Sequence, residues 1–157
     1  MSDESGYLYR EEVEAHPLLY IVLMMVIIPL AYLSSMNPDL TGVPRMGFIL
    51  VLLAMIAIYF NFSTLTIRVT SSMLSATFGV LSHRVELSNI SNIAVETPPW
   101  WRYGGFGVRF EWDRSIGYLQ NYRTGVRVEP VKGWTLFFST DNPEEVVRVV
   151  ETSKKAE

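Results

Sequence analysis

The residues best suited to binding chemistry are Trp100, Trp101, Arg102 and Tyr103, in the loop 98–105 that reads PPWWRYGG. Indole and phenol rings beside a cation suit a boundary between apolar and polar surroundings, because the rings lie half buried there while the cation faces phosphates or water. We therefore predict that this loop contacts a lipid headgroup layer or a partner protein. The alternative is that Trp100 and Trp101 fill one end of the folded domain.

The remaining reactive side chains do not form a catalytic constellation. Glu111 and Asp113 are close enough in sequence for an acid/base pair, but no nucleophile, metal motif or phosphate-binding loop accompanies them. His16 and His83 lack chelating spacing, and the chain has no cysteine. We predict a protein that is not an enzyme, with no catalytic residue, no metal site and no cofactor.

Two long uncharged stretches dominate the first half of the chain. Leu18–Leu33 contains sixteen uncharged residues, and Met46–Phe62 is also uncharged. The turn-rich segment 34–45, SSMNPDLTGVPR, separates them and contains two proline clusters. Because a domain of this size could hardly cover two helices that are apolar on all sides, we predict a membrane hairpin with spans at 18–35 and 46–62.

The charge distribution suggests an orientation for this hairpin. Residues 1–17 carry a net charge of −4, from five acidic residues and Arg10, and are interpreted as an acidic tail. Arg68 and Arg84 follow the second apolar stretch closely, which favours a cytoplasmic C-terminal domain. The predicted localisation is a cell membrane protein with two spans and both termini in the cytoplasm. Residues 63–157 carry only +1, so nucleic acid is not an expected partner.

Short β segments fill the chain after residue 63, and a helix ends it. Seven or eight strands are predicted. The eight candidates lie at 65–70, 73–78, 82–87, 90–96, 108–112, 118–122, 126–129 and 134–139, and the segment 118–122 is alternatively a connecting loop. Asn142 is a suitable N-cap with Pro143 at the first helical position, and valines then form an apolar stripe. This pattern predicts an antiparallel barrel or sandwich with one closing helix.

Several motifs resemble those of bacterial and archaeal membrane proteins with a pleckstrin-homology (PH) domain. The resemblance includes FGVLSHRVELSNISNIAV at 78–95, GGFG at 104–107 and the ending KGWTLFFST followed by NPEE. It implies a membrane α-helical hairpin at 18–62 and, at 63–157, an all-β PH-like half-open barrel of about seven strands closed by a C-terminal helix. The family is largely non-enzymatic.

The chain departs from PH domains that bind inositol lipids in one informative respect. The loop from Thr70 to Ser75 contains no cation, so inositol phosphates are not expected to bind there. The sequence favours a non-enzymatic membrane-anchored scaffold or subunit of a protein complex. Its expected partners are the lipid bilayer and either other membrane subunits or further copies of itself. The alternative is lipid or small-ligand binding at the barrel mouth or the PPWWRY loop.

Overall fold

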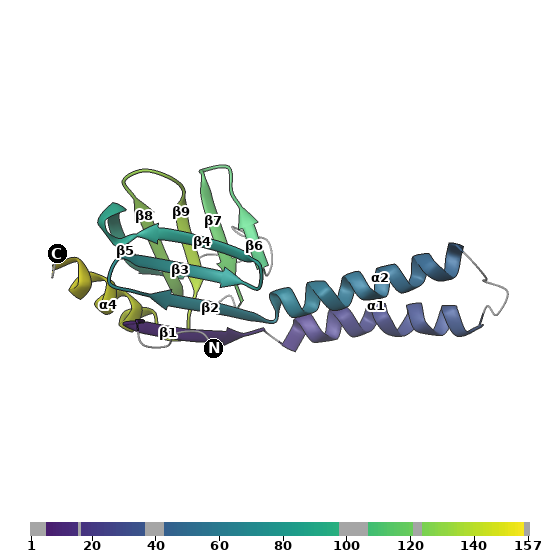
Figure 1. Ribbon diagram of the computed structural model, residues 1–157. Coiled ribbons are helices and arrows are strands. Elements are labelled where there is room, and N and C mark those ends of the chain that lie inside the picture. The colour runs from purple at the N-terminus through teal and green to yellow at the C-terminus, as the bar shows by residue number, and fades with distance from the viewer. Residues whose placement is uncertain (1–5, 16, 37–42, 98–106, 121–123, 156–157) are drawn as a thin grey trace.

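The computed structural model describes residues 6–15, 17–36, 43–97, 107–120 and 124–155. The strands in this part of the chain are β1 (Tyr9–Glu14), β2 (Thr64–Val69), β3 (Met73–Phe78), β4 (Leu81–Glu86), β5 (Ile90–Glu96), β6 (Gly107–Phe110), β7 (Ser115–Leu119), β8 (Gly125–Pro130) and β9 (Thr135–Ser139). The helices are α1 (Pro17–Met36), α2 (Val43–Phe62), α4 (Pro143–Lys155) and the short 3₁₀ helix η1 (Leu87–Asn89). Figure 1 shows a β body with α1 and α2 extending from it as an arm.

The strands form two sheets. The first is antiparallel with the order β1-β2-β3-β4, and the second has the order β5-β8-β9-β7-β6. In the second sheet β7 pairs with β9 in parallel, whereas the other pairs are antiparallel. All eight candidate strands are present, and β1 is an additional one.

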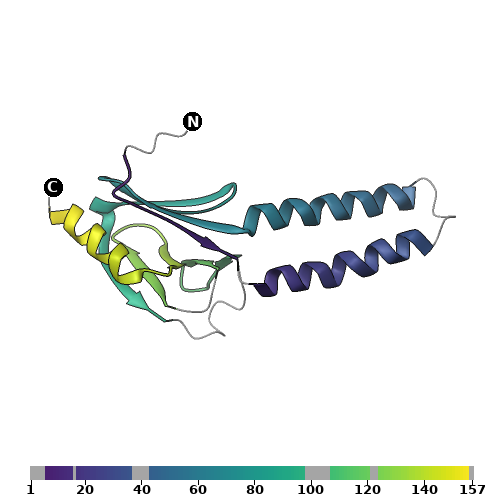
Figure 2. The same ribbon diagram turned by 90° about the horizontal axis from the view of Figure 1, so that it is seen from below.

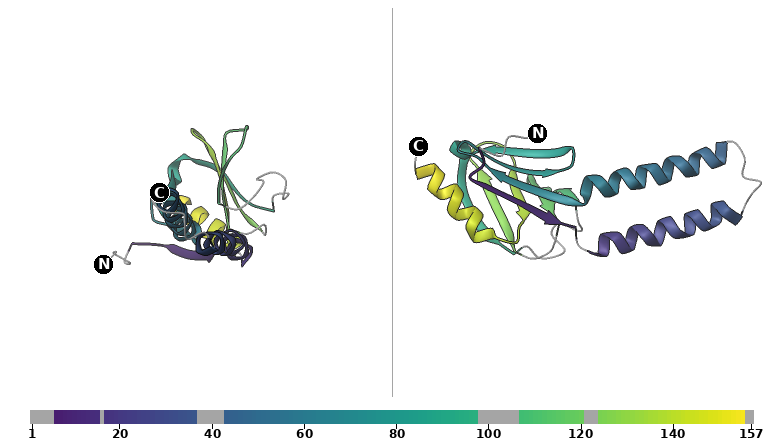
Figure 3. Two further views of the ribbon diagram at one scale, coloured as in Figure 1. Left: turned by 90° about the vertical axis from the view of Figure 1, so that its right-hand side faces the viewer. Right: turned by 60° about the horizontal axis from the view of Figure 1, so that its bottom comes forward.

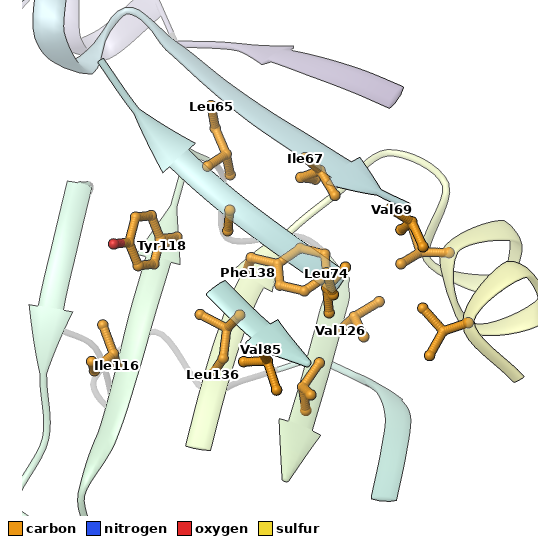
Figure 4. Packing of buried hydrophobic residues seen from close by; sticks show 14 of the residues in the cluster. Leu65, Ile67, Val69, Leu74, Val85, Ile116, Tyr118, Val126, Leu136 and Phe138 are labelled. Atoms are coloured by element: carbon orange, nitrogen blue, oxygen red, sulfur yellow. The ribbon is translucent and has the colours of Figure 1, made fainter. Parts of the chain in front are cut away.

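The body is held together by apolar side chains that alternate along β2 and β3. Every second residue of these two strands is buried, as expected for strands with one face on a core. Figure 4 shows these side chains facing those of the second sheet. The core includes Leu65, Ile67, Val69, Leu74, Phe78, Ile116, Tyr118, Val126, Leu136 and Phe138.

Helix α4 begins at Pro143, as the capping pattern predicts. It lies across the end of the body opposite the arm (Figures 1 and 3). Val146 and Val150 are fully buried in the common core, and α4 contacts β5, β8 and β2. The prediction of a C-terminal helix that closes the domain is therefore confirmed. The helix covers a core between two sheets rather than the end of a barrel.

The prediction of a half-open PH-like barrel of about seven strands is wrong. The described residues instead form nine strands in two sheets, together with three α-helices. Two strands account for the difference. Strand β1 lies in the acidic segment interpreted as a tail, where four of its six residues are charged and hide the apolar alternation. Strand β7 is buried on both faces and pairs in parallel with β9, an arrangement that alternation does not reveal.

The arm is an insertion between two paired strands. Strand β1 leaves the first sheet at Glu14, and the chain returns to it at Thr64, the register partner of Glu14. A further backbone hydrogen bond, 2.8 Å from the Ala15 amide to the Ser63 carbonyl, lies just beyond this pair. Figures 2 and 3 show both helices leaving the body at this point. The segment 1–17 thus contains a strand of the body rather than only a tail.

The prediction of membrane spans at 18–35 and 46–62 is also wrong. Within the part of the chain that the structure describes, no helix combines the length and the apolar character needed to cross a membrane. The predicted two-span localisation with cytoplasmic termini, and its description as a transmembrane protein, are overturned by the same finding.

The inward face of β4 leads to a prediction about pH. His83 pairs in register with the buried Ala76, and burial lowers the pKa of His83 below its ordinary value of 6.5. The unfolded chain therefore binds this proton more readily than the folded chain. We expect stability to be retained above pH 6.5 and to decrease as the pH falls below that value. In urea unfolding at pH 7.5 and 5.5, His83→Gln should lose less stability than the parent chain; an equal loss in both would contradict this assignment.

Candidate interaction surfaces

The arm exposes large apolar side chains on several sides of both helices. On α1 they are Ile21, Val22, Met24, Met25, Val26, Ile28, Tyr32, Leu33 and Met36, and on α2 they are Met46, Ile49, Leu50, Val51, Leu53, Ile56, Ile58 and Phe60. Consecutive residues of a helix point about 100° apart. The exposed trio Met24, Met25 and Val26 thus covers most of the circumference of α1, and a helix that is apolar all round is normally buried. The arm therefore needs an apolar covering.

Near the body the two helices of the arm contact each other. Leu23 is buried between them, and the rings of Tyr20 and Tyr59 meet edge to face with centroids 5.4 Å apart. A hydrogen bond with Tyr59 raises the pKa of the Tyr20 hydroxyl. A cleft of about 340 Å³ lies here, lined by Tyr20, Leu23, Met24, Ile27, Met55, Ile56, Tyr59 and Phe60.

The residues Asn61, Phe62 and Ser63 form the root of the arm, where α2 joins the body. The buried Gln120 donates from its amide nitrogen to the Phe62 carbonyl over 3.1 Å and to the Ser63 carbonyl over 2.9 Å. The ring of Phe62 packs against Phe78, with centroids 5.5 Å apart. The Ser63 carbonyl also accepts the bond from Ala15, so the root holds both ends of the insertion.

A glycine turn secures the other side of the root. Gly79 has φ of +46°, a conformation that favours glycine, and the Val80 amide donates to Asn61 Oδ1 over 3.0 Å. A Cβ atom at Gly79 would lie 2.3 Å from Asn61 Oδ1 and 3.0 Å from the Asn61 Cα. The turn between β3 and β4 therefore fits closely against the end of α2.

Replacement of Gln120 by methionine keeps the side-chain length but removes both donors. The Phe62 carbonyl then has no side-chain donor at a partly buried position, and we expect the free energy of unfolding to fall by about 1 to 3 kcal/mol. Denaturant unfolding measures this change. The control is Asn92→Met, which removes an amide from an exposed site and should change stability by less than about 0.5 kcal/mol. Equal effects in the two variants would show that Gln120 does not hold the root.

The site residues predicted from the sequence, Trp100, Trp101, Arg102 and Tyr103, lie outside the described residues. Nothing in the structure therefore bears on the PPWWRY loop as an interaction site. The role of Gln120 was not predicted from the sequence, and for Gly79 the sequence predicts a turn but not its contact with Asn61. The local sequence pattern contains no signal for Gln120, because the carbonyl groups that it binds belong to residues 58 and 57 positions earlier in the chain.

The pair Glu111 and Asp113 is brought together around Ser115. The Ser115 hydroxyl contacts carboxylate oxygens of both residues, and the Ser115 amide donates to Asp113 over 3.1 Å. Ser115 is completely buried, so a substrate cannot reach its hydroxyl. These bonds stabilise the turn between β6 and β7.

Two ion pairs involve Arg127 of β8, one within that strand and one with β5. Arg127 forms an ion pair with Glu129 at 3.0 Å and another with Glu96 at 3.7 Å. The hydrogen bond from Arg127 lowers the pKa of Glu129. No cluster of three or more potential metal ligands occurs within the described residues.

Comparison with family models, with curated proteins and with solved structures yields no match for this chain. The resemblance to PH-domain membrane proteins therefore remains a prediction.

Proposed function

We propose that this protein is a non-enzymatic scaffold subunit that assembles with further copies of itself through the arm. The observation that carries the proposal is the exposure of large apolar side chains around both helices of the arm. Burial of such side chains stabilises a contact by about 25 cal/mol for each Å² removed from water. An exposed area of this extent needs a partner surface.

A second copy of the chain is the partner best suited to the arm. Between Leu18 and Phe62 the only charged residues are Asp39, which precedes α2 in the sequence, and Arg45, in the first turn of α2. An apolar surface without charges is complementary to itself, so it can form the same contact on both sides of a symmetric interface. Apart from Arg45 at the start of α2, the helices offer no charge to a charged partner, nucleic acid included.

The root supports a scaffold role because it fixes the direction of the arm. The register pair of Glu14 and Thr64 and the bonds of Gln120 attach both ends of the insertion to the body. When arms of different copies pack together, the bodies are held in defined orientations. A flexible attachment would lose this property.

Cysteine cross-linking tests the proposal, since the chain has no cysteine of its own. Single cysteines at Met24, Met25 and Ile28 place thiols on α1, where the native side chains are 54, 66 and 63% exposed. At least one of them should form a disulfide-linked dimer on oxidation, because disulfides require Cβ atoms about 4 Å apart. The matched control is Val80→Cys, at an 88% exposed position on the body. Linkage no faster at any arm position than at the control would contradict the proposal.

The cleft between α1 and α2 supports a second candidate function. Its lining is apolar apart from two tyrosine hydroxyls, and its volume of about 340 Å³ is within the range of small-molecule sites. An elongated apolar ligand fits such a site. If this candidate is correct, the purified protein should contain a bound small molecule. The variant Met55→Trp should release it, because the larger side chain fills the cleft.

A further inference from the structure

A groove on the outer face of the first sheet combines two arginines with several hydroxyl groups. Its volume is about 270 Å³, and its lining residues are Tyr7, Arg68, Thr70, Ser72, Met73, Ser75, Thr77, Ser82 and Arg84. No carboxylate is among the described residues that line it. The groove faces away from the core, because these residues alternate with the buried ones of β2 and β3.

Strand register places the two arginines on either side of one serine. Arg68 is the partner of Ser75 on β3, and Ser75 is in turn the partner of Arg84 on β4. Neighbouring strands lie about 4.8 Å apart, so the two arginine backbones are separated by roughly 10 Å. Both guanidinium groups can therefore reach an anion bound above Ser75.

The state of Arg68 points to a missing acceptor. Its Nε atom is buried and has no hydrogen-bond partner among the described residues. A buried donor without an acceptor typically costs about 1 to 3 kcal/mol. Tyr7 holds the guanidinium group from one side, with the Arg68 Cζ atom 5.5 Å from the ring centroid. An anion in the groove would supply the acceptor that this fixed side chain lacks.

The adjacent charges leave Arg68 and Arg84 available for a ligand. Arg10 is the register partner of Arg68 on β1, and it forms an ion pair with Glu12 at 2.6 Å. Among the described residues no ion pair involves Arg68 or Arg84. Within the described residues, two arginines without an ion-pair partner therefore lie together on this face of the sheet.

We infer that this groove binds the phosphate group of a phosphate monoester, held by Arg68 and Arg84. A phosphate monoester carries a charge of about −1.5 to −2 and three acceptor oxygens, which matches two guanidinium groups. A carboxylate, with one charge and two oxygens, satisfies one arginine fork and leaves the second. Ser82, two residues from Arg84 on the same face of β4, adds a hydroxyl group to the lining of the groove. This inference is independent of the assembly proposed above.

The experiment titrates the full-length protein with inorganic phosphate at constant ionic strength and follows amide shifts of residues 68–84 by NMR. Saturable binding is expected, with an affinity at least about tenfold lower in Arg84→Gln, because a charge-assisted bond contributes about 1.5 to 3 kcal/mol. Arg84 is exposed, so its replacement should leave the fold intact. The control Arg109→Gln removes the same charge from an exposed position of β6, on the other sheet, and should bind like the parent chain.

Two further measurements identify the type of anion and its source. Acetate at the same ionic strength should shift these amides much less than phosphate, and an equal response would overturn the phosphate assignment. Glycerol 3-phosphate tests a soluble ester, and phosphatidic acid in phosphatidylcholine vesicles tests a lipid headgroup. A response to either that Arg84→Gln weakens supports the inference. No saturable response to any of the three phosphates, or equal weakening by Arg109→Gln, refutes it.

Discussion

Replacement of Gly79 by alanine is expected to lower the free energy of unfolding by about 2 to 5 kcal/mol. The positive φ of +46° costs a residue with a Cβ about 1 to 2 kcal/mol. The new Cβ would also overlap Asn61 Oδ1, at 2.3 Å, and approach the Asn61 backbone at 3.0 Å. Forcing an extra methyl group into a packed site costs about 1 to 3 kcal/mol. Denaturant unfolding measures the sum of the backbone cost and the steric cost.

Gly133→Ala is a matched control for this substitution. Gly133 also has a positive φ, of +117°, but the nearest atom to its hypothetical Cβ is 3.9 Å away. The control therefore contains no steric term, but its backbone term is larger, because φ of +117° lies outside the left-handed region open to L residues; hydrogen exchange at Val80 is the measurement that separates the two variants. Hydrogen exchange of the Val80 amide, which donates to Asn61 over 3.0 Å, should accelerate in Gly79→Ala and stay unchanged in Gly133→Ala. Equal stability losses and unchanged exchange would show that the turn does not hold the arm.

The second large effect is expected from charges on the arm. Ile21, Met25 and Ile28 follow one another at helical spacing along one side of α1 and are 55, 66 and 63% exposed. Replacing all three by glutamate places like charges within the proposed contact between copies, where they lose hydration without gaining partners. We expect the assembly to dissociate, with a rise in the dissociation constant of at least about a hundredfold, which corresponds to about 2.7 kcal/mol.

A control with the same three charges on the body distinguishes this effect from general solubility. Val80, Trp112 and Val131 are 88, 106 and 66% exposed, and glutamates at these positions should leave the assembly intact. Circular dichroism should show unchanged β structure in both triple variants, because neither set of side chains is in the core. Dissociation of the control to the same degree would place the contact on the body.

The strands were predictable from the sequence because apolar and polar residues alternate along most of them. In β2, Leu65, Ile67 and Val69 are buried and the residues between them are not, so one face packs on a core whatever the remainder of the fold. The start of α4 was predictable for a local reason as well. Asn142 and Pro143 carry the capping signal within two positions.

The sheet arrangement was not predictable, since it depends on contacts between distant residues. Strand β1 is a strand because β2 lies beside it, about 50 residues later, and the Glu11 carboxylate accepts bonds from the Thr140 hydroxyl and, over 2.9 Å, from the Asp141 amide. In the sequence Glu11 is only one of several acidic residues. Tyr9 also donates to Glu11 over 2.9 Å, and burial together with this bond raises its pKa.

The groove was missed for a similar reason. The loop from Thr70 to Ser75 contains no cation, and the two arginines lie outside it, Arg68 on β2 and Arg84 on β4. Arg68 and Arg84 are sixteen positions apart, and only the registers of β2 with β3 and of β3 with β4 place them beside Ser75. A prediction of both hairpins with their exact register would have been required.

The most direct test of the proposed assembly is the mass of the full-length protein by sedimentation equilibrium. The measurement is made in buffer and with increasing amounts of a mild detergent, whose contribution is subtracted. Self-assembly through the arm predicts a protein mass that is a multiple of 17.9 kDa and that decreases as detergent covers the apolar helices. A protein mass of 17.9 kDa under all conditions, with detergent or lipid bound to the arm, would contradict the account.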